Sequence, residues 1–300
     1  MNSLGCSCPG YFRITSLQQR RLSVIIDMTA SSREDGIALS VDPLYGPSIP
    51  QAQWAPSPSF LLRRHRVLSY LETVAPGSLL EVGCGAGTLL FELHSQGFAC
   101  EALESSAPAI TLARAIAQSN YPLHAEAQSC WQDSFDYLIA LEVLEHIQDD
   151  AEALTTWRDW LNPRGRAIIS VPAHQHKWTA SDEWAGHYRR YDREDVIAVL
   201  EKSGFKIELL ESYGFPIANI ISPMRARIHA KQLVRRQHAG TDAPAFHSSE
   251  SGIERQVESK LFPMMTSFAG RLAMRLAFQL QYWTRHTNLG MGYLAIVKRA

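Results

Sequence analysis

The sequence has no excess of charge of either sign, few cysteines and no long apolar run. Its 29 Lys and Arg nearly balance 30 Asp and Glu, so no overall positive field attracts nucleic acid. Charges or prolines interrupt every apolar stretch before the ~20 residues that a membrane-spanning helix needs. The cysteines are odd in number and lack C-x-x-C spacing, which argues against a disulfide framework; they are Cys6, Cys8, Cys84, Cys100 and Cys130. We therefore expect a cytoplasmic protein, and leave peripheral contact with the inner face of the membrane open.

Apolar residues make up 46% of the 300 positions, enough for the core of one large domain or two small ones. Residues 1–50 differ, because they combine Gly, Ser and Pro with a single short apolar run at 22–28. That run is too short for a secretory signal, and no small-residue cleavage site follows it. We expect a flexible N-terminal extension, and we leave open whether the chain starts at Met1 or at Met28.

Short apolar runs alternate with helical patterns between residues 79 and 172, as in successive βαβ units. The strands expected are 79–82, 99–103, 137–141 and 166–171. The helices expected between them are 88–95, 108–119 and 150–161. An amphipathic helix at 60–73 precedes this region, and a helix at 193–203 and an extended run at 206–210 follow it. The pattern predicts a doubly wound α/β fold.

Glycines cluster where the first of these strands turns into a helix, in the segment L-L-E-V-G-C-G-A-G-T at 79–88. Such a turn lets a ligand approach the backbone beside a helix N-terminus. Glu104 ends the next strand, where a carboxylate can accept both hydroxyls of a ribose. The spacing indicates an adenosine site, although a tight turn without any ligand is the alternative.

The kind of adenosine cofactor depends on the residues around the glycines. A dinucleotide fingerprint needs a small residue where Thr88 stands, and the acidic Glu81 would repel a pyrophosphate. Glu81 suits instead the cationic amino and sulfonium end of S-adenosylmethionine.

Five motifs follow one another across residues 79–172: the segment 81–87, Glu104, F-D-Y at 135–137, L-E-V-L-E-H at 141–146 and L-N-P-R-G at 161–165. In this order they resemble the motifs of class I S-adenosylmethionine-dependent methyltransferases. Residues 292–298 are similar to that family's closing antiparallel strand. The resemblance implies a Rossmann-like, seven-stranded, mostly parallel sheet with an antiparallel last strand, and a donor lying across the carboxyl ends of its strands.

The resemblance also implies which residues bind the donor: Glu81, Gly83, Cys84, Gly85, Gly87, Glu104 and Glu142. Family members commonly hold the adenine amino group with an Asp, often after Gly, near the third strand. This chain departs from that pattern, and the alternatives here are Glu126, Gln128 and Asp133.

Glu142, Glu145 and His146 stand at i, i+3 and i+4, so they share one face if the chain turns helical after the strand at 137–141. Such a face could bind a divalent cation, with Mg or Mn favoured by carboxylates and Zn or Fe admitted by the imidazole. The alternative is that Glu142 fixes the amino acid part of the donor, while His146 packs or acts as a base.

The E-x-x-E-H string resembles two metal-dependent branches of the family, the small-RNA terminal 2'-O-methyltransferases and the ubiquinone-pathway O-methyltransferases. In both, a second histidine lies before the helix that follows the fifth strand, and His187 occupies the similar place here. The resemblance implies a metal-ligand set of Glu142, Glu145, His146 and His187. A cation would lower the pKa of an acceptor hydroxyl, and without one His146 or His187 would take the proton as the catalytic base. Both routes favour O-methylation.

Residues 172–191 form a loop rich in His, Trp, Tyr and Arg after the strand at 166–171. Ligands of open α/β sheets lie outside the carboxyl ends of the strands, so we expect this loop to form the acceptor wall or lid. Arg189 and Arg190 could pair with an anionic acceptor, and Trp178, Trp184 or Tyr188 could stack on a ring. These residues could equally pin the loop to the domain. The loop resembles a bacterial subgroup with a G-H-Y/F-R-R-Y signature.

The remaining chain divides into a methyltransferase core at 51–222, a helical insertion at 223–287 and a closing strand of the core at 288–300. Within the insertion, residues 255–285 pair a broad apolar face with several arginines. That face suits packing in the core, an acceptor cap, a homodimer contact or a membrane surface.

The function expected is methylation of a hydroxyl on a small or lipid-linked acceptor by S-adenosylmethionine, with a divalent cation (Mg, Mn or Zn) as an optional cofactor. The alternatives are an N- or RNA 2'-O-methyltransferase, an NAD-dependent oxidoreductase and a non-catalytic binding module. The near-neutral charge argues weakly against nucleic acid as the acceptor.

Overall fold

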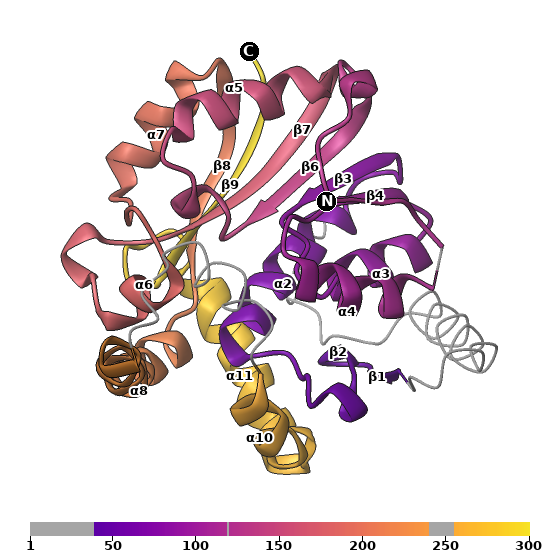
Figure 1. Ribbon diagram of the computed structural model, residues 1–300. Helices are drawn as coiled ribbons and strands as arrows, with labels where there is room; N and C mark the ends of the chain where they lie inside the picture. Colours follow the sequence, from indigo (N-terminus) through magenta and orange to yellow (C-terminus); the bar gives the residue numbers. More distant parts are fainter. Residues whose placement is uncertain (1–38, 119, 240–254) are drawn as a thin grey trace, which may run out of the picture.

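A seven-stranded sheet runs through the middle of the molecule (Figure 1). The computed structural model describes residues 39–118, 120–239 and 255–300. Across the sheet the order is β5-β4-β3-β6-β7-β9-β8, and β9 is antiparallel to both of its neighbours while the other pairs are parallel. The strands are β3 (Ser78–Val82), β4 (Ala99–Leu103), β5 (Leu123–His124), β6 (Phe135–Leu141), β7 (Leu161–Pro172), β8 (Phe205–Tyr213) and β9 (Gly292–Arg299). The predicted doubly wound fold with an antiparallel last strand is therefore confirmed.

Alternation along the inner strands divides the core between the two faces of the sheet. Leu80 and Leu138 pack on the side of α5 and α7, and their neighbours Leu79 and Ile139 pack on the side of α2 and α3. Each such leucine stabilises the fold by about 1.5–3 kcal/mol relative to an exposed one. The helices of the core are α2 (Pro58–Leu71), α3 (Thr88–Ser95), α4 (Ala107–Ala117), α5 (Asp150–Trp160), α6 (Ala180–Ala185) and α7 (Arg193–Lys202). Short 3-10 helices are η1 (Pro50–Ala52), η2 (Ser129–Trp131), η3 (Leu144–His146) and η4 (Gln175–Lys177).

A two-stranded hairpin, β1 (Ser40–Asp42) and β2 (Gly46–Ser48), occupies the end of the stretch predicted as a flexible extension. Tyr45 in its turn is buried, and the Tyr45 hydroxyl donates to the Met265 carbonyl at 2.6 Å. Asp42 forms an ion pair with Arg271. Both partners are more than 200 residues away in the chain, so local sequence patterns could not reveal this order. Residues 1–38 of the predicted extension, Met28 included, lie outside the described residues.

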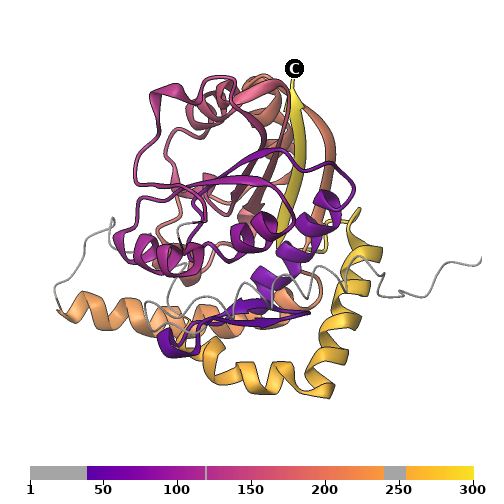
Figure 2. The same cartoon turned by 90° about the vertical axis from the view of Figure 1, so that its right-hand side faces the viewer.

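The helical insertion enters the chain between β8 and β9. Its helices are α8 (Ile217–Ala239), α10 (Gln256–Thr266) and α11 (Phe268–Thr284), and α8 begins six residues before the predicted boundary at 223. Because β9 begins opposite the last residues of β7 and β8, the insertion lies at the carboxyl edge of the parallel strands. Figures 1 and 2 show α8, α10 and α11 together at the end of the molecule remote from the C-terminus. None of the helices in the described ranges combines the length and apolarity required to cross a bilayer.

Candidate active site at the carboxyl edge of the sheet

The glycine turn after β3 has the backbone conformation that its composition predicts. Gly83, Gly85 and Gly87 all have positive φ, at 68°, 55° and 71°, a region that other residues seldom adopt. A methyl group added at Gly83 would lie 2.5 Å from a methyl carbon of Val143, so space there is closed. A methyl group added at Gly85 would meet nothing within 4 Å. The turn therefore leaves open space beside Gly85, just before the N-terminus of α3.

Glu104 lies against this turn, although it comes from the next strand. Its carboxylate accepts from the Gly85 amide at 2.9 Å and from the Ser106 amide at 2.8 Å. These bonds fix the carboxylate beside the open space. The structure thus brings together the two features that the sequence spacing linked. Cys84 also lies in the turn, where burial raises the pKa of its thiol and keeps it neutral.

Glu81 is a buried acid at the end of β3, only 4% exposed. Its Oε2 has no hydrogen-bond partner among the described residues. Burial raises the pKa of Glu81 to about 8, and Arg63 partly opposes that rise. A buried carboxyl of this kind, lacking a partner of its own, suits a cationic ligand.

Glu142 stands apart from the other residues of the E-x-x-E-H string, because its backbone is left-handed, with φ of 58°. Its Oε1 accepts from the Tyr213 hydroxyl at 2.6 Å and from the Ser170 hydroxyl at 3.2 Å. Its Oε2 lies 3.8 Å from a nitrogen of Arg63. The shared helical face expected for Glu142, Glu145 and His146 does not form, since the 3-10 helix begins only after Glu142.

Two residues of this network, Arg63 and Tyr213, carry no signal in the sequence. Arg63 comes from α2 and donates to the Tyr213 hydroxyl at 3.4 Å. Burial lowers the pKa of Arg63, but Tyr213 and Glu142 outweigh this and hold that pKa above its ordinary value. No motif marks either residue, because their partner Glu142 lies about 70 residues or more away from each.

Three of the four predicted metal ligands do meet. The ligand atoms of Glu145, His146 and His187 all lie within 4.8 Å of one another. Glu145 is fully buried, and neither of its carboxylate oxygens has a hydrogen-bond partner among the described residues. The His187 Nε2 approaches Glu145 Oε1 at 3.8 Å, and the His146 and His187 rings meet edge to face at 4.7 Å.

The electrostatics of this cluster follow from its burial. Burial, and then the nearby Glu142, raise the pKa of Glu145 well above its ordinary value. Burial and the neighbouring His187 lower the pKa of His146 to about 4, so its imidazole is neutral at pH 7. A neutral imidazole and a buried carboxyl without a partner are suited to binding a metal ion.

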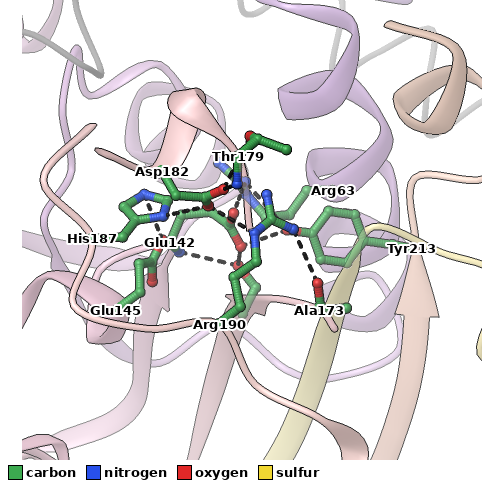
Figure 3. Close-up of polar contacts among 10 residues, drawn as sticks. Arg63, Glu142, Glu145, Ala173, Thr179, Asp182, His187, Arg190 and Tyr213 are labelled. Atoms are coloured by element: carbon green, nitrogen blue, oxygen red, sulfur yellow. Dashed lines mark hydrogen bonds and ion pairs between the residues drawn. The ribbon is translucent and has the colours of Figure 1, made fainter. Parts of the chain in front are cut away.

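Asp182, in α6, orients His187 (Figure 3). Its buried carboxylate accepts from His187 Nδ1 at 3.0 Å, from Arg190 Nε at 2.7 Å and from the Thr179 amide at 2.8 Å. Burial favours a higher pKa for Asp182, but the hydrogen bonds from His187 and Arg190 outweigh it and hold the pKa below its ordinary value. Because an ionised carboxylate accepts only, Nδ1 of His187 carries a proton, and Nε2 is the ring nitrogen that faces Glu145.

The rest of the predicted acceptor loop divides into pinned and exposed side chains. Arg190 is buried against Asp182, and Arg189 pairs with Asp150 at 2.7 Å, so both arginines anchor the loop within the domain. Trp184 is buried as well. Trp178 and Tyr188 remain exposed, at 39% and 57%, as candidates to stack on an acceptor.

A second group of potential ligands, His174, His176 and Asp192, also lies within 4.8 Å. Structural contacts account for two of its members. His174 Nε2 contacts the Gly290 carbonyl at 3.0 Å. The Asp192 carboxylate accepts from the backbone N–H of Gln175 at 3.2 Å and also caps α7.

The structure also separates the three candidates for the adenine contact. Glu126 and Gln128 follow β5, on the same edge as the glycine turn. Asp133 precedes β6 and pairs with Arg299 at the end of β9, which places it at the opposite edge of the sheet. Asp133 is therefore too remote to contact a ligand in the turn.

Residues 51–210 match the family model described as a methyltransferase domain. A ubiquinone biosynthesis O-methyltransferase of Rickettsia canadensis is 29% identical over 111 residues, covering 35% of this chain and 47% of that protein. Phosphoethanolamine N-methyltransferase 1 of Arabidopsis thaliana is 26% identical over 238 residues, covering 68% of this chain and 45% of that protein. The chain thus matches less than half the length of either relative.

A solved structure from Galdieria sulphuraria, proposed to be a sarcosine dimethylglycine methyltransferase, superimposes with a TM-score of 0.52 at 11% identity. The similarity covers 95% of this chain and 99% of that one, and at this identity it shows the fold alone. The family model covers more than half of the chain and includes the glycine turn, Glu104 and the Glu145 cluster. The chain therefore belongs to the family of proteins that carry this methyltransferase domain.

Proposed function

We propose that the protein transfers the methyl group of S-adenosylmethionine to a hydroxyl oxygen of a small or lipid-linked acceptor. The observation that carries this proposal is the open glycine turn with Glu104 fixed against it, on the same edge of the sheet as a buried cluster of Glu145, His146 and His187. The same edge of the sheet thus offers a site for an adenosine-bearing donor and groups able to activate a hydroxyl.

The chain's own residues fit the donor. Glu104 accepts from the ribose hydroxyls, and the open space at Gly85 admits the donor close to the backbone. Glu81 is the buried acid available to the donor's amino group, and Arg63 is the partly buried cation available to its carboxylate.

The donor set of Glu145, His146 and His187 also fits a divalent cation. Two imidazoles and one carboxylate favour Zn or Mn over Mg, which prefers oxygen ligands. The oxygens of Glu145 that lack partners, and the hydrogen bond by which Asp182 fixes His187, are features of a metal-binding site. A cation bound there would lower the pKa of the acceptor hydroxyl and orient its lone pair.

In the transfer itself, the acceptor oxygen forms a bond to the methyl carbon as the bond from that carbon to sulfur breaks. The electron pair of that bond returns to sulfur, and S-adenosylhomocysteine leaves. The hydroxyl proton goes to a base, and without a cation His187 Nε2 is the group that accepts it. Asp182 stabilises the imidazolium that results.

A nitrogen acceptor is the second candidate, because the Arabidopsis N-methyltransferase matches a larger share of this chain than the Rickettsia O-methyltransferase does. Incubating the protein with methyl-labelled S-adenosylmethionine and a metabolite and lipid extract tests both. We expect a labelled product whose mass spectrum places the methyl group on oxygen. A label on nitrogen would favour the nitrogen acceptor over the hydroxyl acceptor. The absence of any labelled metabolite or lipid would contradict both proposals.

Donor binding should release a proton from Glu81. With a pKa of about 8 this carboxyl is mostly protonated at pH 7, and a bound ammonium group favours its ionised form. Affinity for S-adenosylhomocysteine should therefore weaken as pH falls below 8, by up to about tenfold per pH unit. Calorimetry at pH 7 in two buffers of different ionisation enthalpy should show release approaching about one proton per chain. Glu81→Gln should abolish that release, and equal heats in both buffers for the unsubstituted protein would contradict the role of Glu81.

A further inference from the structure

Helix α11 is apolar on two opposite faces, and only one of them is buried. Met274, Ala277 and Phe278 pack against α2 and the turn of the N-terminal hairpin. The other face carries large apolar side chains at four-residue spacing, all exposed to solvent: Phe268, Leu272, Leu276 and Leu280. Phe268 is 85% exposed. A helix that is apolar all round normally has both faces covered.

The neighbouring helices extend this exposure. Trp283 ends the stripe on α11 at 67% exposure. On α10 and α8 the exposed large apolar side chains are Leu261, Met264, Ile220, Met224, Ile228 and Val234. We call these residues, with the stripe on α11, the outer apolar face. Soluble monomers rarely expose so many large apolar side chains at one end, and where they do the surface binds a partner or a membrane.

The charge of the same helices identifies the partner. Together α8, α10 and α11 contain eight Lys and Arg and one acidic residue, Glu258. The whole chain has a net charge of −1, so the rest of the protein is acidic. An apolar face in a strongly basic segment is complementary to an anionic lipid surface.

A second copy of the chain fits this surface less well. Self-association through the outer apolar face would bring two such basic segments together, and like charges in contact oppose association. An aromatic pair at the end of α11 also favours lipid, because Tyr282 and Trp283 are both exposed there and Arg285 lies over the Tyr282 ring at 3.8 Å.

The outer apolar face adjoins the candidate active site through α8. α8 packs against α6 in the acceptor loop, where the His229 ring stacks on Trp184 at 4.2 Å. The same α6 carries Asp182, which orients His187. A surface bound through α8 would therefore lie beside α6 and the predicted acceptor loop (Figure 1).

We propose that the helical insertion binds the surface of an anionic lipid bilayer through the outer apolar face, with the stripe on α11 as its main contact. The apolar side chains enter the boundary between headgroups and acyl chains. The exposed Lys and Arg side chains, among them Arg227, Lys231 and Arg275, pair with lipid phosphates, whereas Arg271 stays paired with Asp42. The proposal concerns binding alone, so it holds whether or not the chain transfers a methyl group.

Flotation of the full chain with vesicles tests the proposal. Vesicles of phosphatidylcholine with about 30% phosphatidylglycerol should carry the protein to the top of the gradient, whereas pure phosphatidylcholine should bind it at least about tenfold more weakly. Leu272→Glu with Leu276→Glu should lower binding to the anionic vesicles at least about 30-fold. Both leucines are exposed, and circular dichroism should show that the variant keeps its fold. Leu272→Ser with Leu276→Ser should show the same direction of change without added charge.

The matched control is Lys202→Glu with Lys206→Glu. Both lysines are exposed, and β8 begins with Phe205 opposite Arg299, at the edge of the sheet remote from α11. This control removes more positive charge than the leucine variant, so unchanged flotation shows that the effect belongs to the outer apolar face. Equal binding of the control and leucine variants, or no flotation of the unsubstituted protein, would overturn the proposal. A dimer in light scattering that the leucine substitutions dissociate, without vesicle binding, would assign the face to a second copy instead.

Discussion

Replacing His187 with alanine is expected to slow methyl transfer by about 100-fold or more while leaving affinity for S-adenosylhomocysteine within about threefold. The reason is that His187 Nε2 faces Glu145, Asp182 fixes this orientation through Nδ1, and His187 forms none of the contacts that hold Glu104 at the glycine turn. Its loss removes either a metal ligand or the base that accepts the hydroxyl proton.

The initial rate at which the labelled product forms measures methyl transfer, and calorimetry measures the affinity for S-adenosylhomocysteine. If a cation takes part, plasma mass spectrometry should find about one divalent ion per chain in the purified protein and much less in the variant, and chelation should reproduce the loss of rate. His286→Ala is a suitable control, because His286 is exposed and lies outside the cluster. Unchanged turnover in the His187 variant and after chelation would leave His187 with only a structural role in the loop.

Replacing Glu104 with alanine should weaken binding of S-adenosylhomocysteine by about 10- to 100-fold, the range expected when hydrogen bonds to a charged group are lost. Glu104 is held at the turn by the Gly85 and Ser106 amides, so its carboxylate is positioned before any ligand arrives. Calorimetric titration measures the change.

The matched control for that change is Glu101→Ala on the same strand. Glu101 pairs with His124 at 2.9 Å and makes no contact with the glycine turn. We expect its replacement to change the affinity by less than about threefold. Equal losses in the two variants would show that destabilisation of β4, rather than loss of a ribose contact, explains the result.

The parts of the fold that follow from local patterns could be predicted from sequence. α3 and β4 match their predicted bounds, because alternation and helical spacing are strong there. β5 was missed, since two residues are too few to show alternation. The hairpin around Tyr45 was missed because its stability depends on Asp42 and Tyr45 meeting the distant residues Arg271 and Met265.

The candidate site likewise contains residues that local patterns predict and residues that only tertiary contacts reveal. The glycine turn and Glu104 were predictable. The turn follows β3 and Glu104 follows β4, and neighbouring parallel strands end side by side. Asp182 and Arg63 were not singled out, because their importance lies in contacts with His187 and Glu142 that only the tertiary fold creates. The positive φ of Glu142 likewise could not be read from the spacing that suggested a shared helical face.

The insertion shows why the sequence left several alternatives open. Packing in the core explains Met274 and Phe278, whereas Leu272 and Leu276 on the same helix remain exposed. Apolar spacing alone cannot distinguish the two faces of such a helix, and only the position of α2 decides which one is buried.

We propose that the open space beside Gly85, with Glu104 held against the turn, binds a sulfonium donor. Calorimetric titration of the unsubstituted protein with S-adenosylhomocysteine, and separately with NAD, tests it most directly. We predict saturable binding of S-adenosylhomocysteine at one molecule per chain and no detectable heat with NAD. Tight binding of NAD with none of the thioether would contradict the account.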